Sequence, residues 1–370
     1  MSQEHAFLHA LAAFRPFISS NKLRELIQRT GAPRAAWEAT GEVLEAHGWT
    51  DEQRSRFQEH RREWRVDTTY EALKKANVAM VTEDDERFPR LLKEIYDPPL
   101  VLYVRGELRA EEIAVAVVGS RKATPYGKTA TNLLVRPLAS RGVTIVSGLA
   151  YGIDAEAHRA TLAVHGRTIA VLGSGVDEMS LYPRAHRQLA ADIIAAGGAV
   201  VSEYAPGTGP QGYFFPQRNR LIAGLSRAVV VVEADEGSGA LITARAGLNE
   251  NREVFAVPGP ITSDLSRGTN ALLGEGATPA RRAEDILETL ELTQLFAPAP
   301  EAVSPPTTQP PLPQPDGTVA LLHLLSGSPL NVDEIVERST LAPNVVASLL
   351  TVLELDGRVR DVGGKHYVRV

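Results

Sequence analysis

The sequence contains no cysteine, and this absence removes several kinds of chemistry at once. Disulfide bonds, thiol nucleophiles and cysteine-ligated zinc or iron–sulfur centres all require that residue. The nine histidines are scattered and show no HExxH-like pairing. We therefore predict neither a metal nor a cofactor for this chain.

Long apolar runs and an excess of positive charge are also missing. No stretch approaches the ~20 residues of a membrane-spanning helix, and the opening MSQEHAFLHALAAFRPF lacks the features of a signal peptide. We predict a cytoplasmic protein without a membrane partner. The net charge is -6, whereas domains that coat duplex DNA are usually strongly basic. Any contact with nucleic acid must therefore come from a local basic patch.

Proline is concentrated in one segment. Residues 297–316 hold eight prolines among twenty residues, a density that prevents helices and central strands. We predict a linker there, followed by a separate unit over residues 317–370. Helical patterns over residues 1–66 predict a small all-helical N-terminal domain, and residues 67–296 form the domain between.

A regular series of short apolar runs begins near residue 113, and each run is followed by a helix-length segment. Such spacing is typical of parallel strands that are buried on both faces and joined by helical crossovers. We predict an α/β fold with an extended Rossmann-like parallel sheet. Two upstream strands, Val78–Thr82 and Val101–Val104, with a helix over Phe88–Tyr96, are expected to extend it. The main strands are expected at Val115–Val118, Thr144–Ser147, Thr168–Leu172, Ala199–Glu203, Ala228–Glu233 and Glu253–Val257.

The C-terminal segment has the pattern of a winged-helix domain. Three helices are expected, the third over about Ala342–Leu355, and Gly363-Gly364 suits a hairpin turn between two alternating segments. Many such domains place the third helix in the DNA major groove. Here that helix contains no Lys or Arg, and the tail has five basic against six acidic side chains. We favour protein contact or a packing role over duplex recognition.

The loops that follow the strands are the candidate sites, because ligands of open parallel sheets bind outside the carboxyl ends of the strands. The first loop holds Gly119, Ser120, Arg121 and Lys122, and Thr124 can cap the next helix. Free N–H groups at that helix start attract anions, and the planar guanidinium of Arg121 suits phosphate. The alternative is that Arg121 and Lys122 are ordinary solvated charges.

A long loop after the fourth strand combines aromatic and basic residues. Three aromatics, ending at Phe215, run into Arg218, Asn219 and Arg220. Exposed aromatics beside arginines suit the stacking of unpaired bases, at roughly 1 to 3 kcal/mol per base. Alternatively, the aromatics anchor the loop in the core, and we expect at least one of them to do so.

Glycines mark two further loops. Gly148 follows the second strand, where it permits either close approach of a ligand or close helix packing. Gly237, Ser238 and Gly239 lie at an expected helix start, an arrangement that binds phosphate. The neighbouring Glu233, Asp235 and Glu236 could be acid/base groups or magnesium ligands, or could cap and orient. Neither GxxxxGK[ST] nor GxGxxG occurs, so the diagnostic nucleotide-binding motifs are missing.

Taken together, the motifs between about residues 113 and 277 resemble those of the DNA-processing protein A family, also called Smf. They occur in order and in register with the expected strand–helix units. The resemblance rests on VVGSR at 117–121, VSGLAYGIDAEAH at 146–158, GSGVD at 173–177 with YP at 182–183, SEY at 202–204, FPQRNR at 215–220, IAGLS at 222–226, VEA at 232–234, GSGALIT at 237–243, VPG at 257–259 and GTN at 268–270.

The resemblance implies a non-enzymatic homodimer that binds single-stranded DNA, protects incoming strands in natural transformation and helps to load the RecA recombinase. The terminal modules resemble the sterile-alpha-motif-like and Z-DNA-binder-like appendages of longer members. Many relatives carry a basic residue where this chain has Gly212, a difference that Lys122 would offset. The predicted DNA-contacting residues are Gly119, Ser120, Arg121, Lys122, Gly148, Phe215, Arg218, Asn219, Arg220, Ser238 and Gly239.

Two other functions are compatible with parts of the sequence. A nucleotide hydrolase of the lysine-decarboxylase-like group would use Glu233 and Asp235 as acid/base groups, although the expected PGGxGT loop is only approximated by Asp235–Gly239. A duplex-binding transcription factor would use the winged helix, but the acidic balance of that segment weighs against it. We rank single-strand binding first.

Overall fold

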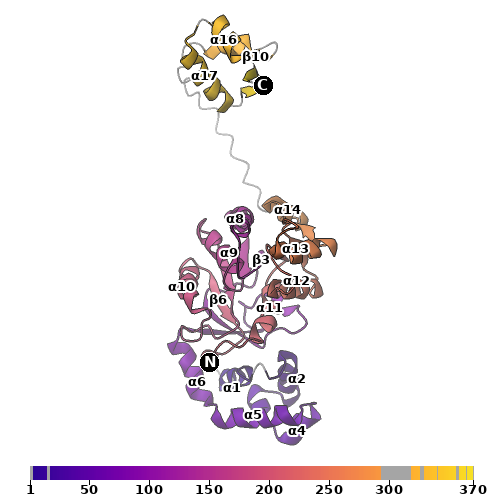
Figure 1. Cartoon of the computed structure of the whole chain (residues 1–370). Coiled ribbons are helices and arrows are strands. Elements are labelled where there is room, and N and C mark those ends of the chain that lie inside the picture. Colours follow the sequence, from indigo (N-terminus) through magenta and orange to yellow (C-terminus); the bar gives the residue numbers. More distant parts are fainter. Residues whose placement is uncertain are drawn as a thin grey trace. The chain divides into compact units, whose positions relative to one another are not determined.

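The apolar runs in the middle of the chain form one large sheet in the computed structural model (Figure 1). The structure describes residues 3–14, 17–292, 318–325, 329–339, 341–355, 358–363 and 365–369. The chain divides into two compact units, residues 1–297 and 298–370. The predicted linker over 297–316 lies outside the described residues, and the domain boundaries stay predictions. No helix among the described residues is long and apolar enough to cross a membrane.

Within the described residues the sheet has nine strands, in the order β1-β2-β6-β5-β4-β3-β7-β8-β9. The six predicted main strands are confirmed as β3 to β8, and each pairs in parallel with its neighbours within this set. Their bounds are β3 Ala114–Val118, β4 Thr144–Ser147, β5 Thr168–Val171, β6 Ala199–Ser202, β7 Ala228–Val231 and β8 Glu253–Ala256, and a short β9, Thr278–Pro279, follows.

The two upstream strands extend the sheet, as predicted, and their pairing at this edge is antiparallel. β1, Ala79–Thr82, and β2, Val101–Gly106, pair antiparallel with each other, and β2 pairs antiparallel with β6. Parallel neighbours need a crossover, usually a helix. Between β1 and β2 there is only a four-residue helix, α7 Arg90–Lys93, in place of the predicted Phe88–Tyr96 helix. It starts after Pro89, and Pro98 disfavours helical backbone at the residue before it.

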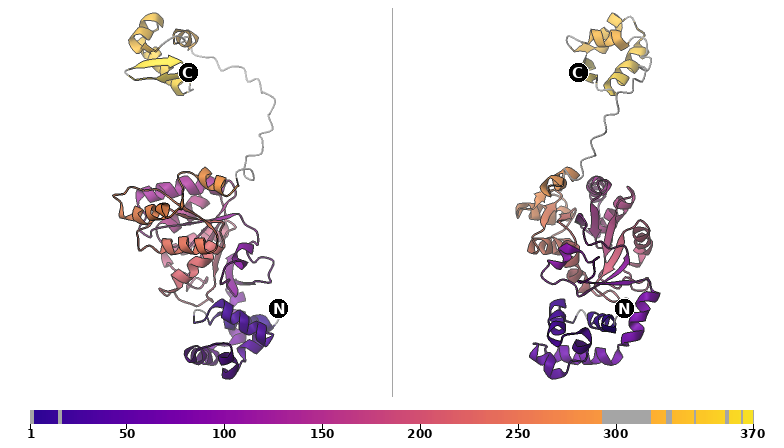
Figure 2. Two further views of the ribbon diagram at one scale, coloured as in Figure 1. Left: turned by 90° about the vertical axis from the view of Figure 1, so that its right-hand side faces the viewer. Right: turned by 180° about the vertical axis from the view of Figure 1, so that it is seen from behind.

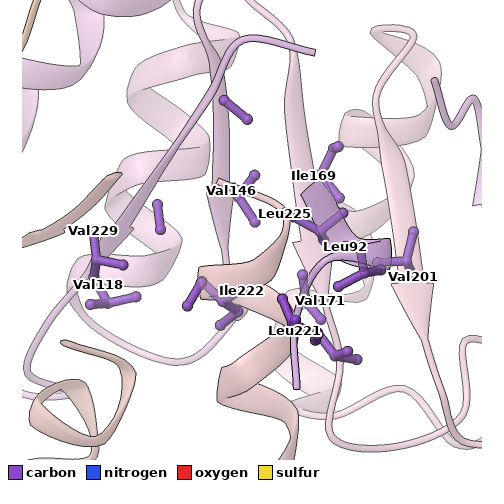
Figure 3. Close-up of a cluster of buried hydrophobic side chains, with 14 of the residues drawn as sticks. Leu92, Val118, Val146, Ile169, Val171, Val201, Leu221, Ile222, Leu225 and Val229 are labelled. Carbon is purple, nitrogen blue, oxygen red and sulfur yellow. The ribbon is translucent and has the colours of Figure 1, made fainter. Parts of the chain in front are cut away.

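Helices cover both faces of the sheet because successive strand residues point to opposite sides. Val118 and Val146 pack on one face with α11 and α12 (Figure 3). Their neighbours Val117 and Ile145 pack on the other face with α8 and α9. The helices of this region are α8 Pro125–Ser140, α9 Ile153–Leu162, α10 Arg187–Ala195, α11 Phe214–Gly224, α12 Gly239–Asn249, α13 Asp264–Gly274 and α14 Ala283–Thr289, with a 3-10 turn at Arg184–His186.

The N-terminal segment is helical, as predicted, and contacts the sheet. Ser19 caps α2 by accepting from the N–H of Lys22, and Gly31 ends the helix in the left-handed region. His9 joins the helices to β2 through a 2.7 Å hydrogen bond between Nδ1 and the hydroxyl of Tyr103. The helices are α1 Gln3–Ala12, α2 Ser20–Thr30, α3 Pro33–Trp37, α4 Gly41–Ala46, α5 Asp51–Glu63 and α6 Val66–Lys75.

Buried histidines make the stability of this unit depend on pH. Burial lowers the pKa of His60, and the larger shifts are those of His9 and His158. Burial, together with the nearby His60, lowers the pKa of His9 from 6.5 to about 4, and burial lowers the pKa of His158 from 6.5 to about 3. The unfolded chain takes up both protons below pH 6.5, whereas the folded chain binds them only at lower pH. Their contribution to stability is therefore complete above pH 6.5 and is lost as the pH falls.

We expect the free energy of unfolding to fall by about 1.4 kcal/mol per histidine for each pH unit below the unfolded-state pKa. Urea unfolding between about pH 7 and pH 5, above the range in which most carboxylates titrate, measures this slope. The His9→Gln variant removes one of the two groups and should show a shallower slope. Equal slopes in parent and variant would contradict the assignment.

The C-terminal unit has the winged-helix order that was predicted. Three helices, α15 Thr318–Leu324, α16 Val332–Ser339 and α17 Pro343–Leu355, are followed by a hairpin of β11, Val359–Asp361, and β12, His366–Arg369. A two-residue strand, β10 Leu330–Asn331, pairs with β12. Gly363 turns the hairpin with a φ of 101°, and Gly364 lies outside the described residues.

Candidate nucleic-acid interface

A cavity of about 580 Å³ opens at the carboxyl ends of β3 and β7. The strand order reverses here, because the chain continues from β3 to β4 on one side and places β7 on the other. Such a reversal is the usual ligand site of an open parallel sheet. Nine of the eleven predicted residues line the cavity, and Gly148 and Arg220 do not.

Main-chain contacts fix the turn that carries Arg121. The N–H of Ser120 donates to the carbonyl of Glu233 at 2.7 Å, and the carbonyl of Ser120 accepts from the N–H of Ile153 at 3.1 Å. Gly152 makes this second contact possible, since it has a φ of +77° and a Cβ there would lie 2.1 Å from the carbonyl oxygen of Ser120. The conformation of this turn is therefore fixed by the protein itself and does not depend on a ligand.

Arg121 extends from this turn over an aromatic ring. Its guanidinium carbon lies 5.4 Å from the ring centroid of Phe215, a cation–π distance. The ring of Tyr182 also lies near that of Phe215, with centroids 5.8 Å apart and tilted by 54°. Arg121 and Lys122 are exposed, and Phe215 is partly exposed. An unpaired base and a phosphate could therefore reach these groups together.

The other two aromatics of the loop have different environments. Phe214 is buried and stacks on Tyr204 with centroids 4.2 Å apart. Tyr213 is half exposed. The expectation that at least one aromatic anchors the loop in the core is confirmed by Phe214.

Arg218 and Asn219 are buried beneath the cavity and tie three loops together. The Nη1 group of Arg218 donates to the carbonyl of Gly148, after β4, at 2.9 Å, and also to the carbonyl of Val171, at the end of β5. Its Nε donates to the Oδ1 of Asn219 at 3.1 Å. The Nδ2 of Asn219 donates to the carbonyl of Gly239, where α12 begins, at 3.2 Å. We call this pair the loop clamp.

Gly148 takes part in the loop clamp and not in the cavity wall. A Cβ at this position would lie 2.5 Å from Nη1 of Arg218. The glycine therefore provides the space that the buried guanidinium occupies.

Burial also shifts the pKa values of Arg218 and Asp154, two charged groups at the cavity. It lowers the pKa of Arg218 to about 10, although the carboxylate of Asp154 acts in the opposite direction. Burial likewise raises the pKa of Asp154, against the effect of Arg218 and of backbone N–H donors that include that of Gly148. Arg218 still carries its charge at neutral pH, but its hydrogen bonds are directed to the protein.

The structure places Arg220 away from the cavity. Its guanidinium pairs with Glu203 at 2.6 Å and with Asp97 at 3.4 Å, and Asp97 also accepts from the backbone N–H of Asn21 at 3.1 Å. Arg220 comes five residues after Phe215, which at 3.6 residues per turn places the two about 140° apart around α11. We therefore correct the predicted contact set by leaving Arg220 out.

The loop after β7 supplies the opposite wall. Ser238 caps α12 by accepting from the N–H of Ala240 at 3.3 Å, and Gly237 and Gly239 line the cavity on each side of it. The free N–H groups and the dipole at this helix start attract an anion. The cavity thus has a helix N-terminus on one wall and Arg121 with Lys122 on another.

The candidate acid/base group Glu233 and the buried His158 both have structural partners. The carboxylate of Glu233 is buried and accepts from the N–H of Thr124 at 2.9 Å and from the hydroxyl of the same residue. It therefore holds the start of α8. His158 is fully buried, with Nδ1 2.7 Å from the hydroxyl oxygen of Thr168. Asp235 remains exposed and lines the cavity.

Some parts of the site were missed from the sequence. Tyr182 lies beside Phe215, and Ile242 and Leu265 add apolar lining. Tyr182 belongs to a motif of the family resemblance, but its sequence position does not show that it meets Phe215, and apolar residues inside a helix give no local signal of a ligand site. Gly212 lines the rim, and no atom lies within 4 Å of the position that its Cβ would take.

Comparison with known proteins identifies the two parts of the chain separately. The model of the family described as DNA recombination-mediator protein A matches residues 79–291, and the model of the DprA winged helix domain matches residues 305–365. Protein Smf of Escherichia coli strain K12 is 42% identical over 333 residues, which cover 89% of this chain and 87% of that protein.

Solved structures of two related proteins also resemble this chain. DNA processing protein A of Streptococcus pneumoniae is 32% identical and has a TM-score of 0.64, covering 78% of this chain and 98% of its own. The corresponding protein of Helicobacter pylori, described for its unique single-stranded DNA binding mode, is 31% identical with a TM-score of 0.51, covering 58% of this chain and 95% of its own.

Proposed function

The chain belongs to the DNA recombination-mediator protein A family, and from this premise we propose that it binds single-stranded DNA in the cavity at the carboxyl ends of β3 and β7. We further propose that it protects incoming strands in natural transformation and helps to load the RecA recombinase, as a homodimer and without a catalytic step. The RecA and dimer parts derive from the family resemblance alone. The cytoplasmic location stays a prediction.

One observation carries the DNA-binding proposal. The same cavity holds two places for phosphate, at Arg121 with Lys122 and at the start of α12, and a partly exposed ring at Phe215. Single-strand binders combine cationic grooves with aromatic stacking platforms. A duplex keeps its bases paired and stacked, so it could not use the ring in this way. The relative from Helicobacter pylori supports the same ligand.

We expect fluorescence anisotropy to show a clear preference for oligothymidylate over duplex of equal length. Phosphate contacts should make binding salt-dependent, with log Kd rising by about 0.7 per contact for each unit of log salt. Equal affinity for duplex would contradict the proposal. Release of free base from nucleoside monophosphates, abolished in Glu233→Gln, would favour the hydrolase instead.

A further inference from the structure

The basic residues of the C-terminal unit are gathered on its hairpin. Among the described residues, four basic side chains lie on or beside β11 and β12, against one acidic residue, Asp361; they are Arg358, Arg360, Lys365 and Arg369. We favoured protein contact because of the total charge of the tail. That total does not show that the basic residues are concentrated on the hairpin. Figure 2 draws the hairpin in yellow, beside the C-terminus.

The helices of this unit carry few positive charges: α16 has one exposed arginine, Arg338, beside an excess of carboxylates. Three exposed carboxylates, Asp333, Glu334 and Glu337, lie on α16. On α17, the helix that would enter a major groove, the exposed positions include Val345, Ser348 and Val352 and no basic residue. The hairpin is thus the basic surface in the described part of this unit.

The strand pairing directs two arginines away from the core. Val359 is buried in the core of this unit, and Arg358 and Arg360 flank it. Successive strand residues alternate in direction, so both guanidinium groups lie on the outer face of the hairpin. Lys365 is exposed at the turn. Among the described residues, none of these three side chains forms an ion pair.

Asp361 does not neutralise this surface. Its Oδ1 accepts from the N–H of Gly363 at 2.7 Å, which places the carboxylate at the turn. As a strand neighbour of Arg360, it also alternates to the other side of β11. The outer face of the hairpin therefore presents Arg358 and Arg360 to solvent, and Lys365 adds a third exposed cation at the turn.

We propose that this surface, Arg358 with Arg360 and Lys365, contacts the phosphates of single-stranded DNA that extends beyond the cavity. The inference rests on the proposed function of the cavity. Exposed cations without carboxylate partners suit a polyanion such as DNA. Because α17 carries no basic residue, we expect these cations to contact the DNA backbone and not to recognise bases. An acidic protein partner would need apolar contacts as well, and the exposed hairpin residues are mainly charged.

A second contact on the same chain would increase affinity only for long strands. Once DNA occupies the cavity, the tethered hairpin meets the same strand at a high effective concentration. A short oligomer fills one site and gains nothing from the tether. The length dependence of affinity therefore separates the hairpin contact from the cavity contact.

The test compares the full-length parent with the triple variant Arg358→Gln/Arg360→Gln/Lys365→Gln by anisotropy. With oligothymidylate of about 6 nucleotides, within the roughly 4 to 16 that one site covers, we expect equal affinity. With about 40 nucleotides, we expect roughly tenfold weaker binding by the variant at low salt. The salt slope should fall by up to about 2, from three lost contacts.

Two controls keep this result specific. The variant Arg29→Gln/Arg34→Gln/Arg56→Gln removes the same charge from exposed N-terminal helices and should bind like the parent. Arg358→Lys/Arg360→Lys keeps the charge and should retain affinity for the long strand. Equal binding of the long strand by parent and triple variant, or a defect confined to duplex, overturns the hairpin proposal alone. If the parent protein does not bind single-stranded DNA of either length, both the cavity proposal and the hairpin proposal are overturned.

Discussion

Arg121→Ala is expected to weaken binding of oligothymidylate by roughly 10- to 100-fold at low salt, or about 1.4 to 2.7 kcal/mol. The side chain is exposed, and it lies over the ring of Phe215. The substitution is expected to remove one contact to phosphate and the cation that lies over the ring of Phe215, on which a base would stack. The salt slope should fall by about 0.7, the value for a single contact to a single strand.

Anisotropy titrations over a series of salt concentrations measure both quantities. Arg136→Ala is the matched control, because Arg136 is exposed on α8 and its Nε donates to Asn132 and not to the cavity. A gain variant tests the same surface in the opposite direction, and thermal unfolding of Arg121→Ala checks that this variant is folded. Gly212→Lys adds a cation on the rim, where the side chain has room, and should tighten binding. Parental affinity in Arg121→Ala would show that the cavity is not the DNA site.

The position of the site could be predicted because its signals are local. Short apolar runs locate the strands, and the carboxyl-end rule then brings the loops at Gly119, Phe215 and Ser238 together. The cavity is lined by all three. Helix starts were equally readable, since Thr124 and Ser238 accept from backbone N–H groups as expected.

The roles of the arginines could not be predicted in this way. Arg218 and Arg220 are two residues apart and look alike in the sequence, yet one is buried and the other forms an ion pair. One of the ion-pair partners that hold Arg220 is Asp97, which is distant from it in the sequence. Burial and long-range pairing depend on tertiary packing, and residue type alone carries no information on either.

The loop clamp gives the second large expected effect. Arg218→Lys should weaken single-strand binding roughly tenfold while leaving the salt slope unchanged. Lysine keeps the charge but cannot reproduce the guanidinium hydrogen bonds to Gly148, Val171 and Asn219. The loops after β4 and β5 would then lose their fixed position. Asn219→Ala, which frees the start of α12, should act in the same direction.

The salt slope distinguishes a clamp from a contact. A residue that binds phosphate lowers the slope when it is removed, whereas a residue that positions others lowers affinity at every salt concentration alike. Arg227→Lys is the matched control, because Arg227 is exposed at the amino end of β7. Thermal unfolding, measured in parallel, defines the temperature below which each variant is folded. If Arg218→Lys retains full affinity while Arg218→Ala lowers both affinity and slope, Arg218 contacts DNA through its charge, and the loop clamp is not its main role.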